Sequence, residues 1–287
     1  MTLLVFGKTG QVATELARLS GRGGLELICL SRAEADLSDP AACAAAIATH
    51  TPSAVINAAA WTQVDGAETD EPAARVVNAD APAAMAQACA GMGIPLVHIS
   101  TDYVFDGTGD SPWTTSDPVA PQNAYGRTKL AGEDAVRTAG GPHAVLRTAW
   151  VFSAHGANFV KTMLRLAETR DQLRVVSDQI GGPTPARAIA EACHEIALTL
   201  IRDPGKSGTY HFSGGPDISW AGFARAIFAA TGAQVEVADI PSSDYPTPAP
   251  RPLNSRLDCS ATQQAFGIAR PDWATGLRDV LSDLRAI

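Results

Sequence analysis

The chain has 287 residues, of which 46% are hydrophobic, and a formal net charge of −8. This length provides for one large domain or two modest ones with a buried core. No apolar run approaches the length of a membrane span, which excludes a membrane-spanning protein, and the acidic balance argues against a nucleic-acid partner, because phosphate binding requires a basic face.

The N-terminal residues 1–7 carry no basic leader and run directly into a glycine turn. This pattern predicts a strand rather than a signal peptide and favours the cytoplasm. The five cysteines are scattered and form no Cys-x-x-Cys pair. Most of them fall in apolar or alanine-rich segments, so we expect reduced, buried thiols and neither a disulfide framework nor a zinc site.

The first strand-to-helix turn has the pattern of a dinucleotide phosphate site. An apolar run over residues 2–6 is followed by a glycine turn at residues 7–12 and then by a helical pattern through Leu16 and Leu19. Such a turn brings backbone N–H groups and a helix N-terminus to a pyrophosphate. An ordinary glycine turn is the alternative, because Gly-x-x-Gly alone is a weak signal.

The second predicted strand, residues 25–30, bears on the choice of cofactor. It ends in Ser31 and Arg32. A site for NAD usually places an acid here to bind the ribose hydroxyls, whereas a 2′-phosphate calls for a cation. Arg32 therefore favours NADPH, although an exposed loop arginine is the alternative. NADH stays open because Glu34 and Asp36 lie close by.

Two further strands complete an alternating pattern of strands and helices. The third, residues 54–56, leads into Ala58, Ala59 and Ala60, whose small side chains permit close approach of a cofactor or simply pack a helix on a sheet. After a helix over residues 72–91, the fourth strand, residues 96–99, leads to Thr101. The alternation predicts an α/β fold with a doubly wound, Rossmann-like parallel sheet, whose ligands bind at the carboxyl ends of the strands.

The stretch from Ser100 to Lys129 has the character of a catalytic centre. If a helix begins near Tyr125, then Tyr125 and Lys129 share one face, and the ammonium group lowers the phenol pKa from its ordinary value of about 10. The hydroxyl of Thr101 is a second hydrogen-bond donor. Together they suit a carbonyl that is polarised and protonated while hydride arrives. A surface Tyr–Lys pair on a solvated helix is the alternative.

The rest of the chain predicts a second, smaller part. We expect a dinucleotide-binding domain of residues 1–148 and 173–205, and a smaller C-terminal substrate-binding domain of residues 149–172 and 206–287. A proline-rich loop there contains Arg251, and Arg256 follows it. These guanidinium groups could bind a diphosphate, or they could be scattered surface arginines.

Several segments together resemble the extended short-chain dehydrogenase/reductase family over nearly the whole chain. They are the glycine turn, Asn57-Ala-Ala-Ala, Ser100-Thr-Asp-Tyr-Val-Phe, Tyr125-x-x-x-Lys129, Arg147-Thr-Ala-Trp150-Val and Arg251-Pro-x-Asn-Ser-Arg-Leu257. Within the family they are most similar to reductases of dTDP-linked 4-keto sugars. The resemblance implies NAD(P)H-dependent reduction of the 4-keto group of dTDP-4-dehydro-L-rhamnose, a nucleotide-sugar substrate.

The resemblance also implies roles for individual residues. Tyr125 is the general acid, Lys129 lowers its pKa and holds the nicotinamide ribose, and Thr101 hydrogen-bonds the keto oxygen. The residues expected to bind the cofactor are Gly7, Thr9, Gly10, Gln11, Val12, Ser31, Arg32, Asp36, Leu37, Ala58, Ala59, Ala60, Thr62, Tyr125 and Lys129. Those expected to bind the substrate are Thr101, Asp102, Tyr103, Tyr125, Trp150, Arg251 and Arg256.

Two departures from the family pattern stand out. Ala13 occupies the place of the third glycine in the turn, which suggests altered helix–sheet packing. Some members are dimers bridged by Mg²⁺ through acidic side chains. Glu15 fills the first acidic position, but Arg187 stands where a second acid is expected. The sequence therefore leaves both Mg²⁺ and a homodimer open and predicts no metal ligands.

Two other functions stay in competition. A nucleotide-sugar epimerase or dehydratase has the same fold, but a 4,6-dehydratase would carry an Asp-Glu pair after the strand-end threonine, where this chain has Asp102 and Tyr103. A non-catalytic protein similar to the regulatory subunit of methionine adenosyltransferase is disfavoured by the presence of Thr101, Tyr125 and Lys129.

Overall fold

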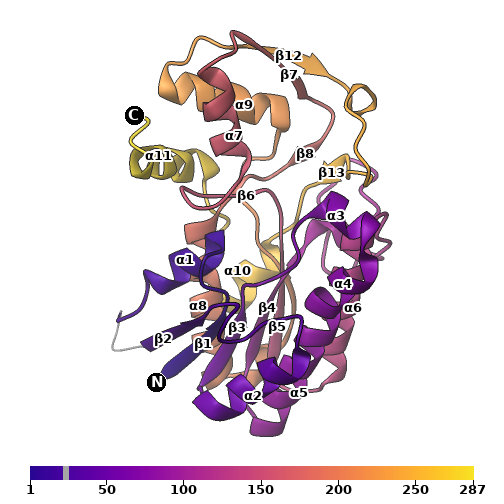
Figure 1. The fold of residues 1–287 in the computed structure, drawn as a ribbon, viewed down its shortest axis with the longest axis vertical. Coiled ribbons are helices and arrows are strands. Elements are labelled where there is room, and N and C mark those ends of the chain that lie inside the picture. The colour runs from indigo at the N-terminus through magenta and orange to yellow at the C-terminus, as the bar shows by residue number, and fades with distance from the viewer. Residues whose placement is uncertain (22–25) are drawn as a thin grey trace.

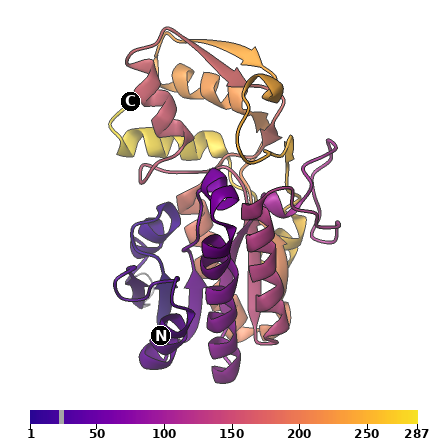
Figure 2. The same ribbon diagram turned by 45° about the vertical axis from the view of Figure 1, so that its right-hand side comes forward.

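The structure is a computed structural model that describes residues 1–21 and 26–287 (Figure 1). Leu25, the predicted first residue of the second strand, lies outside the described residues. A sheet covered by helices forms the larger part, and a smaller group of helices and short strands lies over one end of it in both views (Figure 2). In the described ranges no helix is both long and apolar enough to cross a membrane.

The larger part is built on a six-stranded sheet with the order β10-β5-β4-β3-β1-β2. All its neighbouring strands are parallel. Its strands are β1 (Thr2–Phe6), β2 (Glu26–Leu30), β3 (Ala54–Asn57), β4 (Leu96–Thr101), β5 (His143–Thr148) and β10 (Gly208–His211). The strand order reverses between β1 and β3, which is where such sheets bind ligands. The predicted doubly wound parallel sheet is confirmed.

Helices bury both faces of this sheet. Leu3 and Val5 of β1 belong to one core cluster, and the alternating Leu4 and Phe6 belong to another, because successive side chains of a strand point to opposite faces. The first face is covered by α1 (Gln11–Ala17), α8 (Ala186–Arg202) and α10 (Ser260–Phe266). The second is covered by α2 (Pro40–His50), α5 (Ala81–Met92) and α6 (Ala124–Thr138).

The predicted helix over residues 72–91 is three consecutive elements. They are α4 (Glu71–Arg75), a π-helical turn η2 (Val76–Asp80) and α5, and they follow the short helix α3 (Val64–Thr69). Pro82 has no N–H to donate to the carbonyl of Asn78 four residues earlier, so a regular α-helix is interrupted there. That carbonyl instead lies against Gly132 of α6.

The smaller part encloses its own core, which includes Phe152, Phe223, Val237, Trp273 and Leu277. Its helices are α7 (Phe159–Ala167), α9 (Trp220–Thr231) and α11 (Trp273–Asp283). Its strands are β7 (Gln172–Val176) with β12 (Glu236–Ile240), β6 (Val151–Phe152) with β9 (Thr184–Pro185), and β8 (Ile180–Gly181) between β11 (Ile218–Ser219) and β13 (Asn254–Ser255). Among the described residues, 3₁₀ turns occur at η3 (Asp102–Val104), η4 (Pro204–Lys206) and η5 (Ser242–Asp244).

The structure places two strands, β7 and β10, in the opposite part from the one that the predicted domain boundaries give. β7, expected with residues 173–205 in the dinucleotide-binding domain, pairs with β12 in the smaller part. β10, expected in the smaller part, pairs with β5 and extends the large sheet. β10 joins the large sheet because α8 packs on that sheet and the chain leaving it returns parallel to β5. The roles of the two parts stay predictions.

The close approach of α6 to η2 predicts a stability effect. Gly132→Ala should lower the free energy of unfolding by about 1–3 kcal/mol, as overpacking does, because its Cβ would overlap the backbone carbonyl of Asn78. The matched change Gly91→Ala on α5 meets nothing within 4 Å, and it should raise that free energy by about 0.5–1 kcal/mol, the helix preference of alanine over glycine. Urea unfolding measures both; equal changes would contradict the close packing.

Candidate functional site

The ends of four parallel strands meet at one edge of the large sheet, as expected. The N–H of Gly7, after β1, donates to Leu30 O at 3.0 Å, and the N–H of Ala58, after β3, donates to Phe6 O at 3.0 Å. Gly7 has φ +115°, and an added Cβ would lie 3.2 Å from Ala13 Cβ. Glycine is therefore required at position 7, and the alanine at position 13 is in tight contact with it. An added Cβ at Gly10 would meet nothing within 4 Å.

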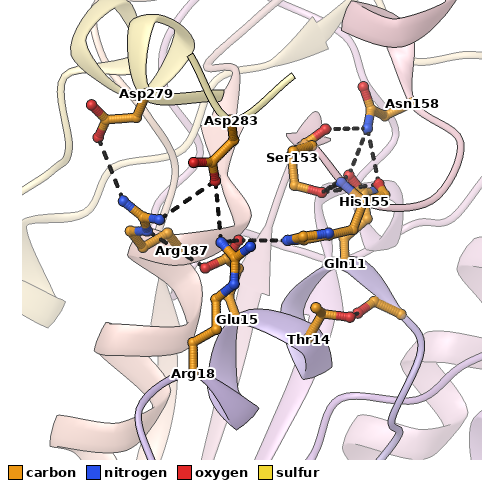
Figure 3. Close-up of polar contacts among 12 residues, drawn as sticks. Gln11, Thr14, Glu15, Arg18, Ser153, His155, Asn158, Arg187, Asp279 and Asp283 are labelled. Carbon is orange, nitrogen blue, oxygen red and sulfur yellow. Dashed lines mark hydrogen bonds and ion pairs between the residues drawn. The ribbon is translucent and has the colours of Figure 1, made fainter. Parts of the chain in front are cut away.

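The turn between β1 and α1 is tied to the smaller part (Figure 3). Gln11 Oε1 accepts hydrogen bonds from Ser153 Oγ at 2.9 Å and from Asn158 Nδ2 at 3.0 Å. Asn158 also caps α7 by accepting from the N–H of Lys161. Ser153 and Asn158 were not among the predicted residues, although an asparagine at the N-cap of α7 is a pattern that the sequence contains. Lys8, Thr9 and Gly10 of the same turn are exposed, and Val12 is buried in the core.

Glu15 of α1 is the centre of a charged network in Figure 3. Its Oε1 accepts from Arg18 Nη1 at 3.1 Å and lies 3.0 Å from His155 Nε2. Arg187 Nε of α8 donates to its Oε2 at 3.5 Å. Both arginines also contact Asp283 of α11. The network joins the larger part to the smaller one.

The surroundings of Glu15 do not fit a bound Mg²⁺ ion. Two guanidinium groups and an imidazole already share its carboxylate, whereas Mg²⁺ needs several free oxygen ligands. In the ranges that the structure describes, no group of three or more His, Cys, Asp and Glu side chains could hold a metal ion.

The loop after β2 places acidic and basic groups beside each other. Ser31 donates to Glu34 Oε2 from its N–H at 2.8 Å and from its Oγ at 2.6 Å, and Lys8 Nζ lies 3.6 Å from the same atom. Arg32 Nε donates to Asp36 Oδ2 at 2.9 Å, while 83% of the arginine side chain stays exposed. The N–H of Ser38 and then Arg32 lower the pKa of Asp36 to about 2. Lys8 and Glu34 were not among the predicted cofactor residues.

The side-chain amides of two buried asparagines hydrogen-bond the backbone of segment 57–62. Asn57 Oδ1 accepts the N–H of Ala59 at 3.2 Å, and Asn78 Oδ1 accepts the N–H of Trp61 at 2.8 Å. Ala58, Ala59 and Ala60 are partly buried and Thr62 is exposed. Leu37, in contrast, lies in the core against the second face of the sheet.

Tyr125 and Lys129 lie on α6, which begins where Asn123 Oδ1 accepts the N–H of Gly126 at 2.8 Å. Lys129 is 2% exposed, and its Nζ donates to Ile99 O at 2.7 Å. Burial lowers the pKa of Lys129 to about 8. The predicted lowering of the pKa of Tyr125 differs from the structure: burial of the phenol outweighs its hydrogen bond to Thr101 and raises that pKa to about 12.

Thr101 ends β4 next to two of the other predicted residues. Its Oγ1 donates to Asp102 Oδ1 at 3.0 Å and accepts the N–H of Tyr103 at 3.2 Å. Burial raises the pKa of Asp102 to about 6. The ring of Tyr103 meets that of Tyr125 edge-on, with centroids 5.5 Å apart. The structure therefore brings together Thr101, Asp102, Tyr103 and Tyr125.

The other predicted substrate residues, Trp150, Arg251 and Arg256, each have different contacts. Arg251 lines a cavity of about 110 Å³ together with Tyr103 and Asn123, and its Nη2 lies 2.8 Å from Asp65 Oδ2. Trp150 has φ +50°, a backbone conformation that is uncommon outside glycine. Its ring stacks on Trp220, with centroids 3.5 Å apart. Arg256 Nη1 donates to Asn254 Oδ1 at 3.0 Å.

Buried polar residues of the strands and of α6 complete the site, and the sequence predicted no role for them. His98 of β4 and Asn57 of β3 contact each other, and His98 Nε2 lies 3.3 Å from Lys129 Nζ. Glu133 of α6 accepts two hydrogen bonds from Arg147 of β5, at 2.9 and 2.7 Å. A polar residue inside an otherwise apolar strand was the signal that could have found His98 and Arg147.

Comparison with known proteins agrees with this geometry. The family described as RmlD substrate binding domain matches residues 1–286. A dTDP-4-dehydrorhamnose reductase of Burkholderia thailandensis is 46% identical over 298 residues, which cover 98% of this chain and 100% of the relative.

Solved structures are also similar along their whole length. That of a dTDP-4-dehydrorhamnose reductase from Clostridium acetobutylicum has a TM-score of 0.91 and 36% identity, with 99% of this chain and 100% of that chain covered. The Bacillus anthracis dTDP-4-dehydrorhamnose reductase in complex with NADP has a TM-score of 0.91 and 30% identity, with 98% and 99% covered. The chain belongs to the RmlD substrate binding domain family.

Proposed function

We propose that this protein reduces the 4-keto group of dTDP-4-dehydro-L-rhamnose with NAD(P)H and forms dTDP-L-rhamnose. The observation that carries the proposal is that Thr101 and Tyr125 come together with Tyr103 at the carboxyl edge of the sheet, where two hydroxyl groups can meet one carbonyl oxygen. The similar dTDP-4-dehydrorhamnose reductases, covered almost completely by this chain, support the choice of substrate.

The cofactor site is supported by the strand ends. The tight contacts at Gly7 and the open space beside Gly10 fit a pyrophosphate lying against the backbone. When bound, the nicotinamide supplies the hydride. The NADP complex of the Bacillus anthracis relative supports NADP(H) or NAD(H) as the cofactor, and the exposed Arg32 favours the 2′-phosphate of NADPH.

The protein residues handle the proton. A phenol with a pKa of about 12 is fully protonated at neutral pH, so Tyr125 can donate its proton to the oxygen that becomes an alkoxide. Thr101 orients that oxygen, and Lys129 holds the nicotinamide ribose. Asp102, Tyr103, Trp150, Arg251 and Arg256 bind the nucleotide sugar, so that the smaller part serves as the substrate domain. Location in the cytoplasm and assembly into a homodimer stay predictions from the sequence.

Removal of the phenol should abolish most turnover. Tyr125→Phe should lower kcat by about 10²- to 10⁴-fold, the usual contribution of a positioned acid, and leave NADPH binding intact. The absorbance at 340 nm of NADPH, followed with dTDP-4-dehydro-L-rhamnose, measures the rate. Tyr210→Phe is the control. Tyr210 lies on the edge strand β10, and its hydroxyl donates to Lys206 O. Near-normal turnover in Tyr125→Phe would sink the proposal.

Removal of the Arg32 charge should change cofactor preference. Arg32→Ala should lower kcat/KM for NADPH by about 10- to 100-fold, the usual worth of a charge-assisted hydrogen bond. It should leave NADH almost unaffected, because NADH has no 2′-phosphate. Exposed Arg170 provides a control variant of equal charge, Arg170→Ala. An equal loss with both cofactors would contradict this role.

Chelation should have no effect on the protein. Because Arg18, His155 and Arg187 already surround Glu15, treatment with EDTA should change neither turnover nor Tm, and added Mg²⁺ should restore nothing. Arg187→Ala should instead lower Tm, because it removes contacts between α8, α1 and α11. A loss of activity on chelation that Mg²⁺ reverses would show that this network is displaced by a metal.

A further inference from the structure

Behind Lys129 lies a chain of buried side chains from three elements. Asn57 of β3, His98 of β4 and Lys129 of α6 are each at most 2% exposed. Asn57 Nδ2 lies 3.1 Å from His98 Nδ1, and His98 Nε2 lies 3.3 Å from Lys129 Nζ. The imidazole thus connects the lysine to the segment that follows β3.

The positions of the hydrogens on the side chains of Asn57 and His98 follow from one backbone group. The N–H of Ala59 can only donate, and it donates to Asn57 Oδ1. The other end of the amide, Nδ2, therefore donates to His98 Nδ1. A neutral imidazole with a lone pair on Nδ1 carries its hydrogen on Nε2, which faces Lys129.

An N–H facing Lys129 favours one form of that lysine. Only the neutral amine has a lone pair that accepts a hydrogen bond from His98 Nε2, whereas the ammonium ion has donors alone. The ammonium form needs the opposite imidazole tautomer, with hydrogen on Nδ1. That tautomer needs Asn57 to turn its amide over, and the N–H of Ala59 then loses its acceptor.

The other ionisable groups near Lys129 do not take over the effect of His98 on the protonation of the lysine. Glu133, one turn further along α6, favours the ammonium form of Lys129 but is itself paired with Arg147 of β5 and with Arg137. Asp102 of η3 acts on Tyr125 rather than on Lys129. Burial and the Lys129 charge lower the pKa of His98 well below its ordinary value, so the imidazole stays neutral.

We propose that His98 is a positioning residue that sets the protonation state of Lys129 and, through Asn57, couples this state to the segment 57–60. The inference rests on the proposed function only where turnover is measured. In that reaction the ammonium form of Lys129 donates hydrogen bonds to the nicotinamide ribose, so the imidazole fixes the pH above which the lysine loses its charge. The segment 57–60 in turn responds to the lysine charge through the Asn57 amide.

The imidazole tautomer is the first test. Long-range ¹H–¹⁵N NMR of the intact protein distinguishes the two ring nitrogens of each of the six histidines. We expect His98 to be neutral with its hydrogen on Nε2, at a pH above the titration of Lys129. Hydrogen on Nδ1 at that pH would overturn the proposal.

The lysine titration is the second test. Lys129 is one of only four lysines, with Lys8, Lys161 and Lys206, so ¹³Cε signals of labelled lysine follow it individually. The wild-type signal should titrate near the pKa of about 8. His98→Asn keeps a partner for Asn57 but removes the N–H that faces Lys129, and it should raise the midpoint by about one pH unit, as loss of a hydrogen bond to the neutral form does. An unchanged midpoint in the folded variant would overturn the proposal.

A second variant tests the amide of Asn57. Asn57→Asp keeps the shape of the side chain and the acceptor for Ala59, but its carboxylate accepts from His98 and reverses the tautomer. It should also raise the midpoint. The matched control is His211→Asn, because His211 is equally buried but bonds Trp113 O and lies beside Arg147. This control should leave the Lys129 signal in place; a shift as large as in His98→Asn would count against the proposal.

The pH profile of turnover separates the two proposals. The wild-type kcat/KM should fall as the pH rises through about 8, and the fall should move to higher pH in His98→Asn. An unmoved profile in an active variant would overturn the role of His98. No turnover in the wild type at any pH would overturn the proposed function instead, and the two NMR tests would still decide on His98.

Discussion

The buried ion pair of Glu133 and Arg147 fixes the helix on which the candidate site depends. Glu133 is fully buried, and its carboxylate accepts two hydrogen bonds from Arg147, one from Ser100 at 2.6 Å and one from Arg137 at 3.2 Å. Burial raises the pKa of Glu133, but Arg147 and Ser100 outweigh it and hold that pKa below its ordinary value. A buried charge is tolerated only when its partners satisfy it so completely. The pair therefore allows only one packing position of α6 against β4 and β5. This packing fixes where Tyr125 and Lys129 lie.

Two glycines let α6 approach the neighbouring backbone closely enough for this packing. A Cβ at Gly132 would overlap the carbonyl of Asn78, and one at Gly126 would overlap that of Tyr103. The second contact sets α6 directly against the turn that follows Thr101. Tyr125 then lies beside Tyr103 because the backbones of α6 and η3 touch, and no long flexible side chain has to reach across.

Local patterns predicted the parts of this arrangement that depend on neighbours in sequence. Tyr125 and Lys129 share a face because four residues separate them on one helix, and the turn at Gly7 follows directly from its strand. The contacts of His98 with Asn57 and Lys129 were not predicted, because these residues meet only after β3, β4 and α6 pack together, from positions 57, 98 and 129. The pairing of β7 with β12 was missed for the same reason: short, irregular strands carry little pattern, and contacts distant in sequence decide where they go. The π-helical turn depends on Pro82 and on the approach of α6 together.

The surroundings of the candidate site favour the uncharged forms of its own ionisable side chains. Burial raises the pKa of Tyr125 to about 12 and that of Asp102 to about 6, and it lowers that of Lys129 to about 8. Each shift favours the uncharged form, and all have the same physical cause, desolvation. In such surroundings an alkoxide that forms on the substrate is screened very little by water, so hydrogen bonds from Tyr125 and Thr101 stabilise it strongly. The fully paired charges of Glu133 and Arg147, one turn of helix further on, keep α6 in place while that charge appears and is neutralised.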